Sequence, residues 1–434
     1  MKITIDTSKI IADNRSKSVG ININYLRDAD ANRTGKPLHE ALTDMGVKRL
    51  RYPGGEKSNR HFFAKPPYEL CEPAASGYYA ERMKESAVMD FDMFIDLVRK
   101  IEAEPHVNVA FHHSEKTGVP IETYIEHAAA WVRYANIKKG YGVKYWEIGN
   151  ENWLDKYPPE ETAYYIKDFS QAMKRADPSI KICASGCNSE WWEKFLPIAK
   201  PYVDVLTVSD YCASGWGNYD HYANQNSLPL IGQAETAIKA IDQYAPEYAD
   251  NMEVVISELN SMDYSENGWA PSNNLGHSLV TFDQFGKLLT NSHVSYGMLW
   301  NTRWMNQNEQ YEKIWYGLDE HNEPLPSGMA VKLWGKFLRD TFLQAEDEGN
   351  LTVYSCKDQT GLSVYILNKY PTEAVREIVA DGSAININSA YVYSGESPDD
   401  IYPVLREYTK YTANQIICKP YSVTVLLVRF DFFR

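Results

Sequence analysis

The sequence predicts an α/β protein, in which a closed (β/α)8 barrel is joined to an accessory antiparallel β-sandwich. Three observations support this prediction. From about residue 18 to residue 325, short β-branched runs alternate with amphipathic helical stretches, which is typical of parallel α/β architectures. These runs number eight. Beyond residue 340 the helical stretches disappear and alternating strands replace them.

The eight β-branched runs decide the architecture of the first region. They lie at residues 20–25, 47–52, 106–111, 144–148, 180–184, 203–209, 254–257 and 295–300. Eight strands favour a closed TIM barrel over an open doubly wound sheet. We therefore expect a barrel domain over residues 18–325.

The helices between these strands are recognised from their period and their capping residues. We expect them at residues 90–102, 121–137, 159–175 and 274–289. In the second, apolar residues recur every three or four positions and form one stripe: Tyr124, Ala128, Trp131, Val132 and Ala135. Such a stripe is typical of a helix in the wall of a barrel.

The C-terminal segment follows a last helical stretch at residues 328–338. Strands are expected at residues 351–355, 362–367, 384–393 and 421–429, and no helix separates them. The N-terminal run Lys2–Asp6 has no partner inside the barrel, so we expect it to join the C-terminal strands. The accessory sandwich should therefore comprise residues 1–15 and 340–434.

Composition and charge limit the classes of partner. The 434 residues carry a formal net charge of -14. This argues against nucleic acid or an anionic membrane as the binding partner, because a protein that binds either one needs a basic face. No apolar run is long enough to span a bilayer, and no signal peptide follows Met1, so we expect a cytoplasmic protein. The 11 Trp and 31 Tyr suit polar ligands with flat faces, such as sugars.

The six cysteines show no framework of disulfides or metal ligands. They are scattered through a chain that is large enough to fold without disulfides, so we expect reduced thiols. Cys183 and Cys187 are four residues apart, but no second Cys or His pair at ligand spacing accompanies them. We expect neither a metal nor another cofactor.

The residues at the C-terminal ends of the strands form the candidate site, because active residues of such barrels lie on that face. Two glutamates stand out: Glu151 after the fourth strand and Glu258 after the seventh. The other polar and aromatic residues at these ends are Asn22, Asn24, Arg51 to Glu56, His112, His113, Asn150, Ser185, Asn188, Asp210, Tyr211, Asn260, Trp300, Asn301 and Arg303.

The segment around the fourth strand carries a family resemblance. Trp146-Glu147-Ile148-Gly149-Asn150-Glu151 resembles the acid/base motif of clan A glycoside hydrolases, and glycoside hydrolase family 51 is closest in motif. Residues 130–136, 141–145, 51–55 and 90–94 are similar to that family too. Residues 255–260, Val-Ile-Ser-Glu-Leu-Asn, resemble the nucleophile segment of the clan.

The resemblance implies a retaining glycosidase with defined roles. Glu151 would be the general acid/base and Glu258 the nucleophile, because cleavage needs a proton for the leaving oxygen and a group that traps the oxocarbenium-like centre. Asn150 would bind the 2-hydroxyl of the sugar. Tyr211 would position Glu258, and Trp300 would form a platform beneath the sugar.

Further substrate contacts are expected from Glu56, His113, Asn260, Trp216 and Arg303. We interpret Gly54-Gly55 as a tight turn that aims residues 56, 59 and 61 at the cleft, rather than as a phosphate cradle. One of the two adjacent histidines, His112 or His113, could equally pack or cap a loop.

Structural interpretations compete with these roles. The two glutamates could form an ion pair at the mouth of the barrel, and Tyr211 and Trp300 could be core aromatics. Glu147 lies within its strand between apolar neighbours, so we expect a buried salt bridge, with Arg51 as the candidate partner, rather than catalysis.

The chain also departs from the family pattern. Asp210 precedes Tyr211 where a His is common, and Leu259 stands where a Trp would be familiar. We expect an arabinofuranosidase-like enzyme acting on plant-type or algal oligosaccharides or polysaccharides. The alternatives are a β-xylosidase, a β-glucuronidase, an endo-acting agarase-like enzyme, or a carbohydrate-binding protein without catalysis. A homo-oligomer is left open.

Overall fold

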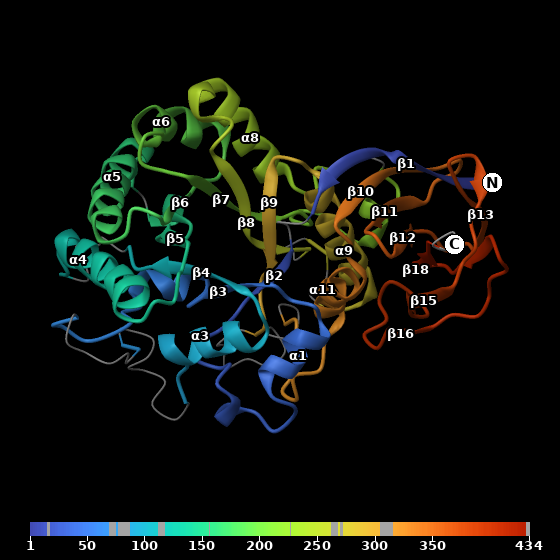
Figure 1. The fold of residues 1–434 in the computed structure, drawn as a ribbon, viewed down its shortest axis with the longest axis horizontal. Helices are drawn as coiled ribbons and strands as arrows, with labels where there is room; N and C mark the ends of the chain where they lie inside the picture. The colour runs from blue at the N-terminus through green and yellow to red at the C-terminus, as the bar shows by residue number, and fades with distance from the viewer. Residues whose placement is uncertain are drawn as a thin grey trace.

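The computed structural model describes the chain apart from residues 15–17, 69–74, 77–86, 112–117, 156, 226, 262–267, 270–271, 304–315 and 431–434. Two bodies lie side by side (Figure 1): a closed parallel barrel and a curled sheet that contains the N-terminal strand and the C-terminal strands. Within the described ranges, none of the helices has the length and apolar character that a membrane span requires.

The barrel closes through eight parallel strands in sequence order, with β9 pairing back to β2. The strands are β2 (Val19–Asn22), β3 (Arg49–Tyr52), β4 (Glu104–Val109), β5 (Tyr145–Ile148), β6 (Lys181–Ser185), β7 (Val205–Tyr211), β8 (Glu253–Asn260) and β9 (Val294–Leu299). Their residues are almost all buried because the barrel interior and the surrounding helices cover both faces. The predicted (β/α)8 barrel is confirmed.

Helices surround the barrel and pack on its outer face (Figure 1). The α-helices are α1 (Leu38–Asp44), α3 (Phe91–Lys100), α4 (Ile121–Val132), α5 (Pro159–Ala176), α6 (Ser189–Ala199), α7 (Tyr219–Ala223), α8 (Gly232–Tyr244), α9 (Leu275–Thr290) and α11 (Pro326–Phe337). Shorter 3-10 segments are η1 (Asp30–Asn32), η2 (Gly55–Arg60), η4 (Asn152–Asp155) and η5 (Pro246–Tyr248), and a π-helical segment, η3 (Arg133–Lys138), extends α4.

Helices α1, α6, α7 and α8 have no counterpart among the expected ranges. The Asn188 side chain caps α6 by accepting a hydrogen bond from the Trp191 N–H, and Pro197 lies inside the helix. A proline is ordinarily a helix breaker, so the sequence pattern there does not indicate a helix. Packing of Trp191 and Trp192 against the barrel supplies the stability that the local propensity lacks.

The accessory domain is one curled sheet of ten strands. They are β1 (Lys2–Asp13), β10 (Thr341–Asp347), β11 (Thr352–Lys357), β12 (Gly361–Asn368), β13 (Ala374–Ala380), β14 (Ser383–Ala384), β15 (Ser389–Ser394), β16 (Val404–Glu407), β17 (Gln415–Cys418) and β18 (Ser422–Arg429). As expected, the N-terminal strand joins this sheet. It pairs antiparallel with β10 and parallel with β13, so the pairing is mixed rather than purely antiparallel.

The curl of the sheet encloses its own apolar core. Ile3 and Ile5 of β1 pack in one cluster with Val364 of β12, Ile416 of β17 and Leu426 of β18. The opposite side of the sheet joins the barrel core through aromatic contacts. Trp334 of α11 stacks on Phe282 of α9 at 4.8 Å and approaches Tyr365 of β12 at 4.3 Å between ring centroids.

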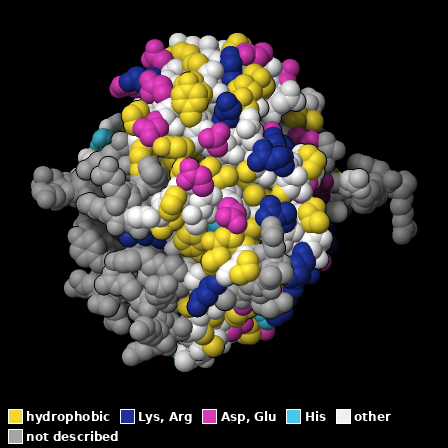
Figure 2. Space-filling model, turned by 90° about the vertical axis from the view of Figure 1, so that its left-hand side faces the viewer, with side chains coloured by type: hydrophobic (Ala, Val, Ile, Leu, Met, Phe, Trp, Pro, Cys, Tyr) yellow, Lys and Arg dark blue, Asp and Glu magenta, His cyan; other side chains and the backbone are white. Residues whose placement is uncertain are grey.

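The division into a barrel domain over residues 18–325 and an accessory domain of residues 1–15 and 340–434 stays a prediction. Helix α11 lies between these two ranges in sequence and packs on α9. Figure 2 shows a side of the molecule on which acidic and basic side chains are interspersed.

Candidate active site

Glu151 and Glu258 come from β5 and β8, three strands apart in the barrel, and both lie at its C-terminal face. Glu258 belongs to β8 and is 3% exposed, whereas Glu151 follows β5 and keeps part of its surface accessible. The turn that carries Glu151 is tight. Gly149 has φ 70°, and a Cβ on it would lie 2.1 Å from Oδ1 of Asn152. Only glycine fits there, and Glu151 itself has φ 47°.

Arg51, at the end of β3, binds Glu258 and the neighbour of Glu151 at once. Its Nη1 donates to Oε1 of Glu258 at 2.7 Å, and its Nη2 donates to Oδ1 of Asn150 at 2.8 Å. Arg51 is fully buried, so these charge-assisted bonds act away from solvent. One planar guanidinium therefore fixes both the carboxylate and the amide.

Tyr211, at the end of β7, donates a hydrogen bond from its hydroxyl to Oε2 of Glu258 at 2.7 Å. Both oxygens of Glu258 are therefore held, one by Arg51 and one by Tyr211. Asn150 is held too, because its backbone N–H and C=O both bond the side chain of Asn59 in η2 at 2.8 and 3.1 Å. These bonds orient the carboxylate and the amide toward the same face of the barrel.

Glu151 has a different electrostatic environment from Glu258. Burial of its carboxyl group, followed by the negative charge of Glu258, raises the pKa of Glu151 to about 8. At neutral pH Glu151 is therefore mostly protonated, whereas Glu258 accepts hydrogen bonds from a cation and a hydroxyl. Two carboxyl groups in such different environments can divide the roles of acid and nucleophile between them.

Glu147 lies deeper in the barrel and forms the salt bridge that the sequence predicts. Its Oε2 is 2.7 Å from Nε of Arg51, and neither side chain is exposed. Burial alone would raise the pKa of Glu147, but the charge of Arg51 and a hydrogen bond from His106 lower it to about 2.

Trp300 follows β9 and lies against the glycine turn after β3. A Cβ on Gly55, which has φ 64°, would be 1.9 Å from the Trp300 ring, so the turn is shaped to receive that ring. Asn260 of β8 donates from Nδ2 to the Trp300 carbonyl at 2.5 Å, and the Trp300–Asn301 peptide is cis. The buried Lys57 amine lies 5.2 Å from the centroid of the ring.

The other residues expected at the site are placed differently. Glu56 is exposed in η2, and Trp216 is 6% exposed, with its ring stacked on His221 at 5.2 Å. Arg303 is 2% exposed and donates to Asp28, to the Asp319 carbonyl and to Asn322, which favours a structural role. His112 and His113 lie outside the described residues.

The Gly54-Gly55 turn directs one of the expected residues, Asn59, to the site, but not His61. Asn59 reaches the site through its bonds to Asn150. His61 instead packs edge-on against Tyr25 and Tyr52, at 4.6 and 5.4 Å between ring centroids, and it is fully buried. Burial lowers the pKa of His61 to about 3, so the ring stays neutral.

Sequence reasoning missed Arg51 as the centre of the site. The sequence places it at a strand end and makes it the candidate partner of Glu147, but no sequence pattern indicates its bonds to Glu258 and Asn150. The available signal was an inward-facing arginine directly before a Tyr-Pro-Gly-Gly turn. Asn22 of β2 was likewise noted only as a strand-end residue, although its Oδ1 accepts from Arg51 Nη1 at 3.1 Å.

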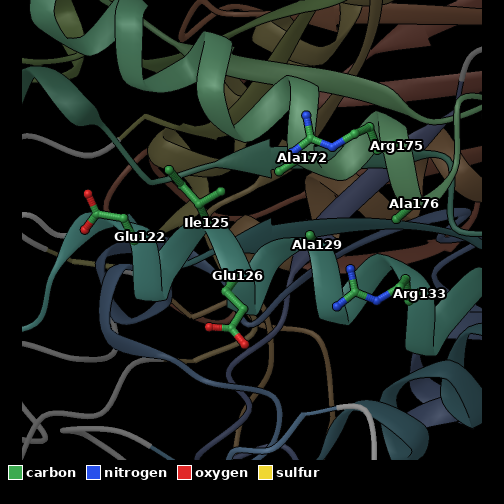
Figure 3. A pocket seen from close by; sticks show the side chains of 8 residues that line it. All are labelled: Glu122, Ile125, Glu126, Ala129, Arg133, Ala172, Arg175 and Ala176. Carbon is green, nitrogen blue, oxygen red and sulfur yellow. The ribbon is translucent and has the colours of Figure 1, made fainter.

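A surface groove lies far from these carboxylates, between α4 and α5 on the outer wall of the barrel (Figure 3). Ala129, Ala172 and Ala176 line it together with Glu126 and Arg133. None of the residues that line it lies at a strand end, so it is not part of the candidate site.

Comparison with known proteins points to one family. A family model described as the alpha-L-arabinofuranosidase 1 domain matches residues 41–244, which include β3, β5 and β7 of the site. Probable alpha-L-arabinofuranosidase C of Aspergillus terreus is 27% identical over 244 residues, 49% of this chain and 45% of the relative. The matched part thus spans about half the length of this curated relative.

Solved structures share the whole fold. An arabinofuranosidase structure superposes with a TM-score of 0.75 at 16% identity, covering 98% of this chain and 99% of the other. The alpha-L-arabinofuranosidase of Thermotoga maritima in its arabinose complex gives 0.73 at 16% identity, covering 99% and 100%. The chain is thus similar to family 51 of the clan A glycoside hydrolases, and the resemblance found in the sequence is confirmed.

Proposed function

We propose that this protein is a retaining glycoside hydrolase with arabinofuranosidase-like specificity, and that Glu258 is its nucleophile and Glu151 its general acid/base. The observation that carries this proposal is the contrast between the two carboxyl groups. Glu258 accepts hydrogen bonds from Arg51 and Tyr211, whereas burial and the charge of Glu258 raise the pKa of Glu151 to about 8.

In the first step Glu258 attacks the anomeric carbon, and the bond to the leaving oxygen breaks. Glu151 transfers its proton to that oxygen, so the leaving group departs as a neutral alcohol. The product is a glycosyl ester on Glu258, and Glu151 is left ionised.

In the second step Glu151 removes a proton from water, which attacks the anomeric carbon and releases the sugar from Glu258. The ester removes the negative charge of Glu258, which is the second cause of the raised pKa of Glu151. The pKa of Glu151 therefore falls in the intermediate, which suits its change from acid to base. Two displacements at one carbon return the original anomer.

The remaining site residues would bind the sugar. Asn150, whose Oδ1 accepts from Arg51, would contact the 2-hydroxyl through its amide. Trp300 would form the platform beneath the ring. Contacts with substrate from Glu56, His113, Asn260, Trp216 and Arg303 stay predictions.

The substrate is proposed to be a plant-type or algal oligosaccharide or polysaccharide with terminal arabinofuranose. The relatives named above are arabinofuranosidases, which supports this sugar. A β-xylosidase, a β-glucuronidase or an endo-acting agarase-like enzyme would use the same pair of carboxylates. The cytoplasmic location stays a prediction, which cell fractionation would test, and light scattering would show whether the protein forms the homo-oligomer that the sequence leaves open.

A panel of nitrophenyl glycosides, supplemented by polysaccharides, tests the proposal. We expect the highest kcat/KM on the α-L-arabinofuranoside, with a first product of retained configuration by NMR. An inverted first product would refute the double displacement. Sugar binding without turnover on the whole panel would favour a carbohydrate-binding protein instead.

A further inference from the structure

Glu147 is a buried carboxylate to which the two proposed reaction steps give no role. It lies in β5, four residues before Glu151, and its side chain is fully buried. Four side chains donate hydrogen bonds to it. They are Arg51 Nε at 2.7 Å, His106 Nε2 at 3.1 Å and Asn108 Nδ2 at 3.3 Å, all to Oε2, and Thr207 Oγ1 at 2.8 Å to Oε1.

In every hydrogen bond that Glu147 makes in this cluster, the partner donates the proton and Glu147 accepts it. With a pKa of about 2 its carboxylate can only accept, so the bond to His106 requires a proton on Nε2 of the imidazole. Burial lowers the pKa of His106, so the ring is neutral and its Nδ1 accepts. The donor to Nδ1 is the hydroxyl of Tyr296, at 2.9 Å, whose pKa burial raises well above 10.

Arg51 connects this cluster to the proposed reacting groups. Its Nε is bound by Glu147, its Nη1 donates to Glu258 and Asn22, and its Nη2 donates to Asn150. A guanidinium is planar and rigid, so the bond at Nε sets where both Nη atoms lie. The orientation of Glu258 and Asn150 therefore depends on a carboxylate that neither of them touches in the described contacts.

We propose that Glu147 is a positioning residue for glycosidic bond cleavage: its carboxylate fixes the guanidinium of Arg51, which in turn holds Glu258 and Asn150 in their reactive orientation. This inference rests on the proposed function of the same site. Glu147 also balances charge. Without it, the full positive charge of Arg51 would act on Glu258 and make that carboxylate a weaker nucleophile.

The charge of Glu147 also affects the pKa of Glu151. After burial and the charge of Glu258, the charge of Glu147 is a further cause that raises the pKa of Glu151, whereas Arg51 lowers it. The other titratable side chains that influence Glu147 or its neighbours come from the surrounding strands: Arg49 and Arg51 of β3, His106 of β4, Cys183 of β6, Glu258 of β8 and Tyr296 of β9. Neutralising Glu147 should therefore lower the pKa of Glu151.

Glu147→Gln tests the inference on the aryl arabinofuranoside. We expect kcat to fall by roughly 10- to 100-fold with a smaller change in KM, as for a misplaced reacting group. We also expect the basic limb of the pH profile to move to lower pH. A role in stability alone would leave kcat unchanged in protein that remains folded, whereas the basic limb follows the charge of Glu147.

Asp283→Asn is the matched control. Asp283 is also a buried carboxylate that accepts hydrogen bonds from hydroxyls and lies near a cation, but its partners are Tyr222, Tyr354 and Lys369, at the junction with the accessory sheet. Its kcat and pH profile should match those of the wild type, whereas its Tm should fall.

Thr207→Val is a second test of the positioning role, for the case in which Glu147→Gln does not fold. It removes one donor to Glu147 and leaves the charge in place, so we expect a loss in kcat of about threefold to tenfold without a shift of the basic limb. A folded Glu147→Gln variant with wild-type kcat and pH profile would overturn the inference. If Glu147→Gln does not fold, wild-type kcat in Thr207→Val would overturn it.

The wild-type chain separates this inference from the proposed function. No turnover by the wild type on the panel would refute the proposed function and the positioning role together. Turnover by the wild type, its loss in Glu258→Ala and wild-type behaviour of Glu147→Gln would refute only the positioning role.

Discussion

Two buried carboxylate clusters have similar chemistry and different positions. Inside the barrel, Glu147 accepts from Arg51, His106, Asn108 and Thr207. At the junction with the accessory sheet, Asp283 of α9 accepts from the Tyr222 hydroxyl at 2.6 Å and from the Tyr354 hydroxyl, and the Lys369 amine lies 3.4 Å away. Both carboxylates are almost fully buried.

The difference lies in where the cation directs its remaining interactions. Arg51 continues from Glu147 to Glu258 and Asn150. Lys369 lies over the Tyr222 ring, 4.3 Å from its centroid, and so stays within the junction. Burial and hydrogen bonding alone therefore do not identify a functional carboxylate. Its partners' other contacts decide whether breaking the cluster changes chemistry or stability.

Glu258→Ala should give the largest effect. It removes the proposed nucleophile and leaves Arg51 without its partner in the site, so we expect kcat to fall by at least about 10⁴-fold on every substrate. Stopped assays on the aryl arabinofuranoside and on oligosaccharides would measure it. Retention of more than a hundredth of the wild-type rate would exclude Glu258 as the nucleophile.

Glu151→Ala should depend on the leaving group. On oligosaccharides we expect a loss of about 10²- to 10⁴-fold, because the leaving oxygen receives no proton. An activated aryl glycoside needs no acid, so glycosylation should persist and azide should restore turnover by replacing water as nucleophile. Equal losses of activity on both substrates, without rescue by azide, would show that Glu151 is not the general acid/base.

Asp283→Ala should act on stability rather than on chemistry. Truncation leaves the Lys369 charge and the Tyr222 hydroxyl without their acceptor, and the Tyr354 hydroxyl with only the Asp283 carbonyl at 3.4 Å; breaking such a buried pair costs about 3 kcal/mol. Urea unfolding of the variant and the wild type would measure the change. An unchanged free energy of unfolding, or a changed kcat in folded protein, would show that this junction is not separate from the site.

The activity of the wild type should fall at high pH. The folded pKa of Glu151, about 8, lies above the ordinary value of 4.5, so its proton is present below about 8 and lost above it. We expect kcat/KM to decline about tenfold per pH unit beyond that point. The same shift makes the free energy of unfolding decrease as pH rises from 4.5 to about 8, because the folded state holds the proton more tightly. A kcat/KM that stays constant up to pH 10 would contradict the first statement. A free energy of unfolding that does not fall between pH 4.5 and about 8 would contradict the second.

A matched pair of hydroxyl deletions should give the smallest effects. Tyr211→Phe removes the donor to Glu258 Oε2 and should lower kcat by about tenfold with little change in Tm. Tyr354→Phe removes a donor to Asp283 and should cost about 1 kcal/mol of stability with wild-type kcat. If the two variants behaved alike, the contrast between the clusters would be wrong.

The barrel was predictable because its strands carry their own signal. A strand buried on both faces must be apolar and β-branched along its length, and eight such runs separated by helices leave few alternatives. The strands β10, β13 and β16 were not predicted because charged and small residues interrupt them, as in the Ala374–Ala380 strand, and β17 was not predicted because it has only four residues. Pairing with neighbours, rather than propensity, makes these segments strands.

The sequence by itself determined the barrel, the place of the N-terminal strand, the two glutamates at the ends of the fourth and seventh barrel strands and the ion pair of Glu147. Each rests on a local pattern or on a motif that a short segment carries. Only the tertiary structure decided that Arg51 serves Glu258 and Asn150 at once, that Arg303 is bound to Asp28, and that the pKa of Glu151 is raised. These features depend on burial and on hydrogen bonds between residues up to 275 positions apart, which exist only once the strands have closed. A residue's chemistry can be read from its type, but the partners that tune it are set by the fold.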